Sequence, residues 1–271
     1  MKKLDNEWLE WININLEISR DKNEMFEILI KNDFQYDEVV KHLKILETEK
    51  QPYNCECCST SCDCCSVNHI LKNHTSTEKI STDKVYIYKV VNFLTEYECD
   101  ELLHNLNNED FKRSTTTNDD YEKDKKFRTS STCYLKQSNK VYNNLDNKIC
   151  EFIGIEKERS EMCQAQKYIV GQEFKLHADY FHEDEFNKKF LLNGGQRTWT
   201  FTIYLNDVEE GGTTYFPFIN LDIIPKKGTA VIWCNLDRNQ KGNEYSYHSG
   251  NPIIKGEKYI ITKWFRREKR K

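Results

Sequence analysis

Residues 198–205, TWTFTIYL, alternate between two kinds of side chain. The apolar residues from Trp199 to Leu205 fall on one face of an extended strand, and three threonines with Tyr204 fall on the other. Side chains two residues apart in a strand point to the same face, so alternation over eight residues predicts a β-strand.

Similar short segments, rich in β-branched and aromatic residues, follow one another from residue 163 onward. Turn signals such as EEGG and PKKG separate them, and seven or eight strands of this kind predict a sandwich or barrel. The expected strand segments are CQAQKYIV, QEFKLHADYF, TWTFTIYLND, TTYFPF, TAVIWCN, EYSYHSG and EKYIITKWFR. Two helices should precede them, one capped by Thr95 with Glu98 in a capping box and one within VYNNLDNKICEFIGI. The expected fold class is therefore mainly β with flanking helices (α+β), with a jelly roll as the natural candidate.

The chain divides into three parts by composition. Residues 1–50 carry apolar side chains at helical spacing and predict a small helical unit for capping or for binding a protein partner. Residues 51–82 are rich in Cys, Ser, Thr and Asn and predict a linker, whereas residues 83–271 hold the β-rich domain. Within that domain, residues 112–128 are almost free of apolar side chains and predict an exposed loop.

The total charge and the hydropathy exclude some partners. A net charge of -4 over 271 residues gives no electrostatic reason to expect nucleic acid. There is no apolar run of signal-peptide length and none of eighteen residues that would cross a membrane. We therefore expect no membrane partner and a cytoplasmic location.

The eleven cysteines are unevenly distributed. Six lie in CECCSTSCDCC, from Cys55 to Cys65, and the other five are scattered, as small core residues usually are. Six thiols in a reducing compartment favour a soft-metal site such as zinc over a disulfide framework, and His69 and His74 could add nitrogen ligands. A reduced, flexible linker is the alternative, and the sequence leaves both open.

The stretch GQEFKLHADYFHEDEF, residues 171–186, contains a candidate metal site. His177 and Asp179 are two residues apart, so in a strand both side chains point to one face. His248 in YSYHSGNP is a candidate third ligand from a neighbouring strand. Two imidazoles and one carboxylate are typical of non-haem Fe(II) oxygenases, although zinc hydrolases also use such sets.

Lys258 begins a strand on which Ile260, Thr262 and Trp264 share its face. If that face points into the barrel, the ammonium group is buried among apolar side chains and needs an anion to offset the cost of its burial. A ligand carboxylate would supply that anion. The alternative is a lysine that faces water beside the preceding turn.

The segments QKYIVGQEFKLHADYF, TIYLNDVEEGGTTYFP, PKKGTAVIWCN and YHSGNPIIKGEKYIITKWF together resemble the prolyl 4-hydroxylase family of 2-oxoglutarate- and Fe(II)-dependent oxygenases. The resemblance covers residues 85–268 and extends to FLTEYECDELL and FRTSST. It implies a double-stranded β-helix that hydroxylates C4 of prolyl residues in peptides or proteins and releases succinate and CO2. The implied cofactors are Fe(II), 2-oxoglutarate, O2 and ascorbate.

The resemblance also implies roles for particular residues. His177, Asp179 and His248 would ligate iron, and Lys258 would bind the distal carboxylate of 2-oxoglutarate with help from Tyr168 and Thr200. The implied substrate-binding residues, of which Arg128 and Trp264 are also candidate catalytic residues, are Arg128, Glu161, Arg197 and Trp264.

Two positions depart from the family pattern. Phe174 replaces a tyrosine that is usual three residues before the first ligand, and Arg266 stands where histidine is also found. The loss of a phenolic hydroxyl concerns the substrate rather than the metal. Hydroxylation of lysine or of a non-protein substrate is therefore one alternative. A non-catalytic adaptor, whose helical unit and cysteine cluster recruit partners, is another.

Overall fold

A computed structural model describes residues 3–17, 20, 22–32, 34, 36–43, 63–80, 82–116, 126–182, 184 and 187–270 of the protein. The chain separates into two compact units, residues 1–51 and residues 52–271. In the described part of the chain, no helix combines the length and the apolar character needed to cross a lipid bilayer.

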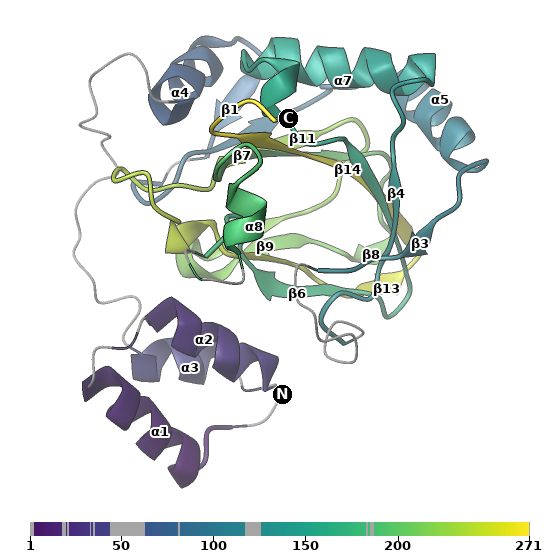
Figure 1. The fold of residues 1–271 in the computed structure, drawn as a ribbon. Coiled ribbons are helices and arrows are strands. Elements are labelled where there is room, and N and C mark those ends of the chain that lie inside the picture. Colours follow the sequence, from purple (N-terminus) through teal and green to yellow (C-terminus); the bar gives the residue numbers. More distant parts are fainter. Residues whose placement is uncertain are drawn as a thin grey trace. The chain divides into compact units, whose positions relative to one another are not determined.

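In the described residues of the first unit the chain forms three short helices, as the spacing of the apolar residues predicts (Figure 1). They are α1 (Asn6–Glu17), α2 (Lys22–Lys31) and α3 (Tyr36–Leu43). Their apolar faces meet in a small core, in which Met25, Leu29 and Leu43 are fully buried. The indole of Trp8 packs edge-on against the ring of Phe34, with the ring centroids 5.0 Å apart.

The second unit is built on three antiparallel β-sheets (Figure 1). The eight-stranded sheet, in spatial order, contains β1 (Thr77–Lys79), β2 (Ile87–Val90), β11 (Ala230–Cys234), β7 (Arg197–Tyr204), β14 (Glu257–Arg266), β5 (Gln164–Ile169), β4 (Ser131–Tyr134) and β3 (Lys112–Arg113). The four-stranded sheet contains β10 (Leu221–Ile223), β9 (Thr214–Phe216), β12 (His248–Gly250) and β6 (Phe174–His177). The third sheet pairs β13 (Ile253–Lys255) with β8 (Glu210–Gly211). The large and the four-stranded sheets face one another as a jelly roll, the predicted fold.

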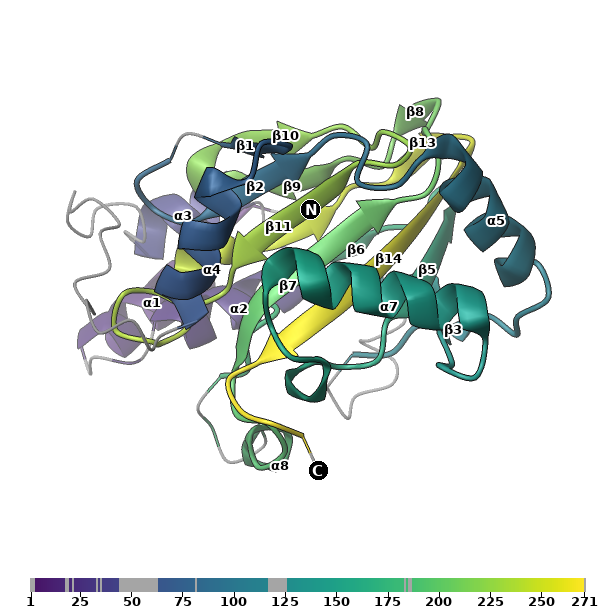
Figure 2. The same cartoon turned by 90° about the horizontal axis from the view of Figure 1, so that it is seen from above.

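Helices cover the outer face of the eight-stranded sheet (Figure 2). They are α4 (Asp63–Asn73), α5 (Glu96–Leu106) and α7 (Lys140–Ile153). Helix α5 has the predicted capping box, in which the Thr95 side chain and the Glu98 side chain each accept from the other residue's backbone N–H. Helix α7 ends at Gly154, whose φ of 73° favours glycine. The described residues also include the short helices η2 (Lys157–Arg159), α8 (Lys188–Leu191), η3 (Pro217–Ile219) and η4 (Glu244–Ser246).

The two faces of strand β7, which its alternating sequence makes different, pack against different layers of the fold. Phe201, on its apolar face, packs against Phe93 with ring centroids 4.9 Å apart, beneath the helices. Thr202, on the other face, lines a cavity between the sheets. Both faces are therefore buried, because helices cover one side and the four-stranded sheet covers the other.

Three local predictions need correction. The segment 112–128 is not wholly an exposed loop, because Lys112–Arg113 forms β3 and both Ser114 and Arg128 are buried; residues 117–125 lie outside the described residues. Strand β6 ends at His177, so Asp179 lies beyond it rather than on it. In EYSYHSG only the last three residues form a strand, since Glu244–Ser246 is a 3₁₀ turn.

The segment 51–82 is partly regular structure. Asp63–Asn73 forms α4, with Val67 and Leu71 buried, and Thr77–Lys79 pairs with β2 at the sheet edge. The first four cysteines of the predicted zinc cluster lie outside the described residues.

Candidate active site

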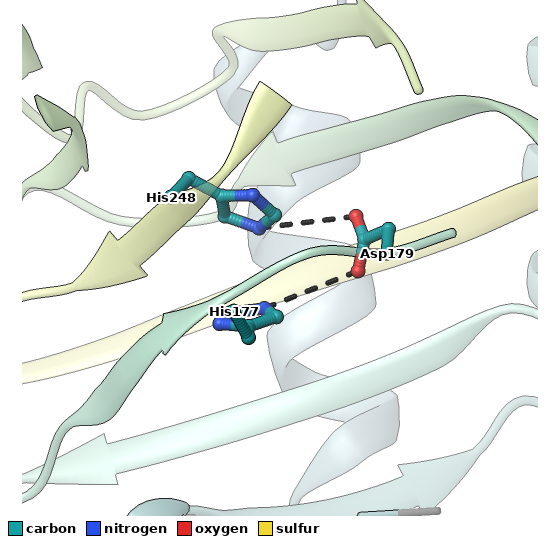
Figure 3. A group of neighbouring side chains, drawn as sticks. All are labelled: His177, Asp179 and His248. Carbon is teal, nitrogen blue, oxygen red and sulfur yellow. Dashed lines mark ion pairs between the residues drawn. The ribbon is translucent and has the colours of Figure 1, made fainter. Parts of the chain in front are cut away.

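His177 and His248 face each other across the four-stranded sheet. They are direct partners in the antiparallel pairing of β6 with β12, so their side chains point to the same side of the sheet. The carboxylate of Asp179 completes the group (Figure 3). Its Oδ1 lies 3.9 Å from Nε2 of His177, and its Oδ2 lies 3.8 Å from Nε2 of His248. One possible ligand atom from each residue lies within 4.8 Å of the others, a separation that a single metal ion bridges.

Both imidazoles are prepared to donate a lone pair from Nε2. Nδ1 of His177 lies 2.7 Å from the carbonyl oxygen of Lys175, and Nδ1 of His248 lies 3.0 Å from that of Ser246. A carbonyl oxygen only accepts, so the proton resides on Nδ1 and Nε2 is free to bind a metal. Burial, reinforced by His248, lowers the pKa of His177 to about 3, which keeps that ring neutral.

The Asp179 carboxylate is oriented from behind by a chain of hydrogen bonds. Thr200 Oγ1 donates to Asp179 Oδ2 over 2.7 Å, and the Asn235 amide donates to Thr200 Oγ1 over 2.8 Å. Burial disfavours the charged carboxylate, but His248, His177 and Arg197 outweigh this effect and lower the pKa of Asp179. The carboxylate therefore stays ionised, as a metal ligand must.

A cavity between the sheets continues from the histidines to Lys258. The four residues Lys258, Ile260, Thr262 and Trp264 of β14 all line it, as predicted for one face of that strand. The Lys258 side chain is 2% exposed, and its Nζ donates to the carbonyl oxygen of Gly212 over 2.6 Å. Burial lowers the pKa of Lys258 to about 7. Among the described residues no carboxylate pairs with Lys258, so an anionic ligand would supply the counter-charge of its ammonium group.

Aromatic rings surround the lysine. Its Nζ lies 5.5 Å from the ring centroid of Tyr168 and 5.6 Å from that of Tyr204. Tyr168 lines the cavity, whereas Thr200 does not and is turned toward Asp179. The implied roles of Tyr168 and Thr200 at the cosubstrate stay predictions.

Three buried donors that line the cavity have no hydrogen-bond partner among the described residues. They are Nε1 of Trp233, Nε1 of Trp264 and Nε of Arg128. A buried donor without a partner costs about 1–3 kcal/mol. Unpartnered donors on residues that line one cavity with a buried ammonium group suit ligands that carry acceptor oxygens, such as a carboxylate or a peptide carbonyl.

Phe174 and Arg128 lie beside the first histidine. The Phe174 ring stacks on the His177 imidazole, with centroids 3.5 Å apart and planes at 16°. The Arg128 guanidinium lies over the Phe174 ring, 4.7 Å from its centroid. Its Nη1 donates to the Thr115 carbonyl oxygen. Phe174, which stands where the family usually has a tyrosine, therefore lies on the cavity wall beside His177.

Glu161, Arg197 and Arg266 form one ionic network at the end of β14. Both oxygens of Glu161 accept from Arg197, at 2.6 and 2.7 Å, and Oε1 also accepts from Arg266 at 2.8 Å. Burial opposes ionisation of Glu161, but the two arginines lower its pKa to about 2. The Arg197 guanidinium lies 4.1 Å from the ring centroid of Trp264 and donates to the backbone oxygen of Asp179. Of the four implied substrate residues, Arg128 and Trp264 line the cavity, whereas Arg197 packs on the Trp264 ring and Glu161 holds Arg197.

The structure adds residues that the sequence interpretation omitted. Gln166, Thr202, Thr214 and Trp233 line the cavity, and Asn235 supports Asp179 through Thr200. Thr202 shares the threonine face of its strand, so the alternation of TWTFTIYL carried a signal for it. Gln166 lies two residues before Tyr168 on β5 and shares its face, whereas Thr214, Trp233 and Asn235 reach the site only through contacts between distant segments.

Comparisons with known proteins agree with this geometry. A family model described as the 2OG-Fe(II) oxygenase superfamily matches residues 163–266. Prolyl 4-hydroxylase 5 of Arabidopsis thaliana is 35% identical over 196 residues, 64% of this chain and 66% of that protein. Probable prolyl 4-hydroxylase 10 of the same plant is 34% identical over 72% of this chain and 73% of its own length. The crystal structure of the viral collagen prolyl hydroxylase vCPH from Paramecium Bursaria Chlorella virus-1, in complex with 2OG, is 27% identical, with a TM-score of 0.53, and the match covers 66% of this chain and 95% of that one.

Proposed function

The chain belongs to the prolyl 4-hydroxylase family of 2-oxoglutarate- and Fe(II)-dependent oxygenases, and from this premise we propose that it hydroxylates C4 of prolyl residues in a peptide or protein. Succinate and CO2 would be the coproducts. The observation that carries the proposal is the position of the His177, Asp179 and His248 group and the Lys258 ammonium in the same cavity.

The three ligand residues would hold Fe(II) through Nε2 of each histidine and an oxygen of Asp179. Fe(II) and 2-oxoglutarate together supply the oxidative chemistry, in which O2 is consumed, 2-oxoglutarate is decarboxylated and one oxygen atom enters a C–H bond of the substrate. The protein contributes the fixed Nδ1–H tautomers and the orientation of the Asp179 carboxylate by Thr200.

Lys258 would pair with the carboxylate of 2-oxoglutarate that lies away from the metal. The buried lysine has Gly212 as a neutral acceptor, so a ligand carboxylate would be its counter-charge and would favour its protonated form. Ile260 and the surrounding aromatic rings keep water from this end of the cavity and strengthen the interaction.

The wall next to His177 would receive the prolyl residue. Arg128 and Trp264 line the same cavity as His177, and each has a buried donor atom that can bond a peptide carbonyl. Glu161 and Arg197 would act through Trp264, by fixing its ring from behind. Phe174 presents an apolar ring where a phenol is usual, so a pyrrolidine ring meets no hydroxyl there.

Mass spectrometry of a peptide array tests the proposal. Peptides containing proline, lysine or neither are incubated with the enzyme, Fe(II), 2-oxoglutarate and ascorbate, which we propose as the reductant that keeps the iron Fe(II). We expect an addition of one oxygen to proline, identified as 4-hydroxyproline by amino-acid analysis, and none with Asp179→Ala. If lysine alone gained oxygen, the enzyme would be a lysyl hydroxylase. If no peptide gained oxygen while succinate was still released, the substrate would not be a peptide.

A further inference from the structure

The thiols of Cys64 and Cys234 lie in contact, although 170 positions separate them in the chain. Their sulfur atoms are 3.4 Å apart, and the two residues are 2% and 1% exposed. Cys64 is the second residue of α4 and belongs to the Cys-rich segment, whereas Cys234 ends β11 of the large sheet. We propose that these two cysteines are the site of a reversible disulfide that staples α4 to the catalytic sheet.

Independent contacts fix both partners in this position. Val67 and Leu71 bury the apolar face of α4, and the Tyr88 hydroxyl donates to the Asn68 side chain over 2.5 Å. Tyr88 lies on β2, directly opposite Ile232 of β11. The helix and the strand that carry the two thiols are thus held together without the bond, and closing it requires the sulfurs to approach by about 1.4 Å.

The oxidant is a small-molecule disulfide such as oxidised glutathione. The Cys64 thiolate attacks one of its sulfurs, forms a mixed disulfide and releases one thiolate. The Cys234 thiolate then attacks the Cys64 sulfur, which forms the Cys64–Cys234 bond and releases the second thiolate. The two cysteines lose two protons and two electrons in total, and the small disulfide is reduced to two thiols.

Access to the buried pair is through the first turn of α4. The first backbone N–H groups of a helix have no partner within it, so this turn opens at lower cost than the rest of the helix. Cys65, the next residue, is already partly exposed. The bond would also fix the end of β11 that carries Asn235, whose amide supports Thr200 behind the metal group.

Peptide mapping of the full-length protein identifies the bond. Tryptic digestion gives a peptide of residues 228–238, in which Cys234 is the single cysteine, and a peptide of residues 51–72, which contains Cys64. After equilibration with oxidised glutathione, alkylation and digestion without reductant, we expect these two peptides to be linked, with fragmentation assigning the bond to Cys64. Cys64→Ala should abolish the link, and Cys65→Ala, its neighbour in the same helix, should retain it. The proposal would be overturned if the peptide of residues 228–238 were found only in its alkylated form. It would also be overturned if the link persisted in Cys64→Ala.

Thermal unfolding measures what the staple does. Because the bond would close a loop of 170 residues, the oxidised protein should melt about 10 °C above the reduced protein, a difference that dithiothreitol reverses. Each variant is compared with itself under the two conditions, so a fold weakened by substitution does not obscure the result. An unchanged melting temperature in a protein shown to be cross-linked would refute the staple. Neither readout needs iron or turnover, so the outcome is independent of the proposed hydroxylation.

Discussion

Thr200 Oγ1 donates a hydrogen bond of 2.7 Å to Oδ2 of Asp179 and itself accepts one from the Asn235 amide. A carboxylate held in this way is oriented for a metal ion before the ion arrives, and loss of such a supporting partner typically costs about 10–100-fold in metal affinity. The family resemblance implies instead that Thr200 contacts 2-oxoglutarate. The two roles make different predictions.

Thr200→Val should weaken Fe(II) binding by about 10–100-fold, because it removes the donor to Asp179 while it preserves the shape of the side chain. Thr200→Ser, which restores the hydroxyl, should bind Fe(II) nearly as the wild type does. Equilibrium binding of the metal under anaerobic conditions checks both variants. Unchanged metal affinity with a weakened affinity for 2-oxoglutarate would instead make Thr200 a cosubstrate contact.

Lys258→Ala should raise the dissociation constant for 2-oxoglutarate by about 10–100-fold, since a charge-assisted hydrogen bond is worth about 1.5–3 kcal/mol. Metal binding should survive, because Lys258 is not part of the ligand group. Lys255→Ala is a matched control: Lys255 is exposed on β13 and pairs with Glu209. Calorimetric titration of 2-oxoglutarate should show no change for that control, and an unchanged constant for Lys258→Ala would remove the lysine from the cosubstrate site.

The affinity for 2-oxoglutarate should depend on pH above 7. Burial lowers the pKa of Lys258 to about 7, so the unliganded protein loses the ammonium proton as the pH rises through that value. If only the charged lysine binds the dicarboxylate, the apparent affinity falls about tenfold for each further pH unit. Titrations at pH 6, 7, 8 and 9 measure this slope. Lys258→Arg, which stays charged, should give a flat profile, and a flat wild-type profile would show that the lysine keeps its proton.

Asp146→Ala should destabilise the fold by about 3–5 kcal/mol, because it leaves the ammonium group of Lys263 buried without its carboxylate. The Lys263 side chain is 1% exposed and contacts Asp146 Oδ1. Lys157 also pairs with Asp146 but is 26% exposed, so Lys157→Ala should cost less than about 1 kcal/mol. Urea unfolding of the three proteins compares these costs. Equal losses for both variants would mean that burial does not distinguish the two ion pairs.

The sequence predicts most of the scaffold because its signals are local. The capping box at Thr95, the alternation of β7 and the common face of β14 all depend on residues within one element, and the structure confirms each. The family, the jelly-roll core and the enzyme class were likewise predicted and are confirmed.

The remaining features depend on contacts between distant segments. Asp179 lies beyond the end of β6 and still reaches the two histidines. The alternation of residues in the strand does not predict where the strand ends. The sequence pattern assigns Arg128 to an exposed polar loop, yet its guanidinium is buried over Phe174. The contact of Cys64 with Cys234 joins a helix and a strand at opposite ends of the domain sequence. Such pairings are set by the three-dimensional packing of the sheets, which composition and periodicity do not encode.

We propose that His177, Asp179 and His248 together form one iron site, and anaerobic equilibrium dialysis with Fe(II) measures binding at that site. We predict one ion bound per wild-type chain, retained binding in Lys258→Ala and a loss of at least about 100-fold in affinity in Asp179→Ala. Asp179→Ala protein that binds Fe(II) as tightly as the wild type would show that Asp179 is not an iron ligand.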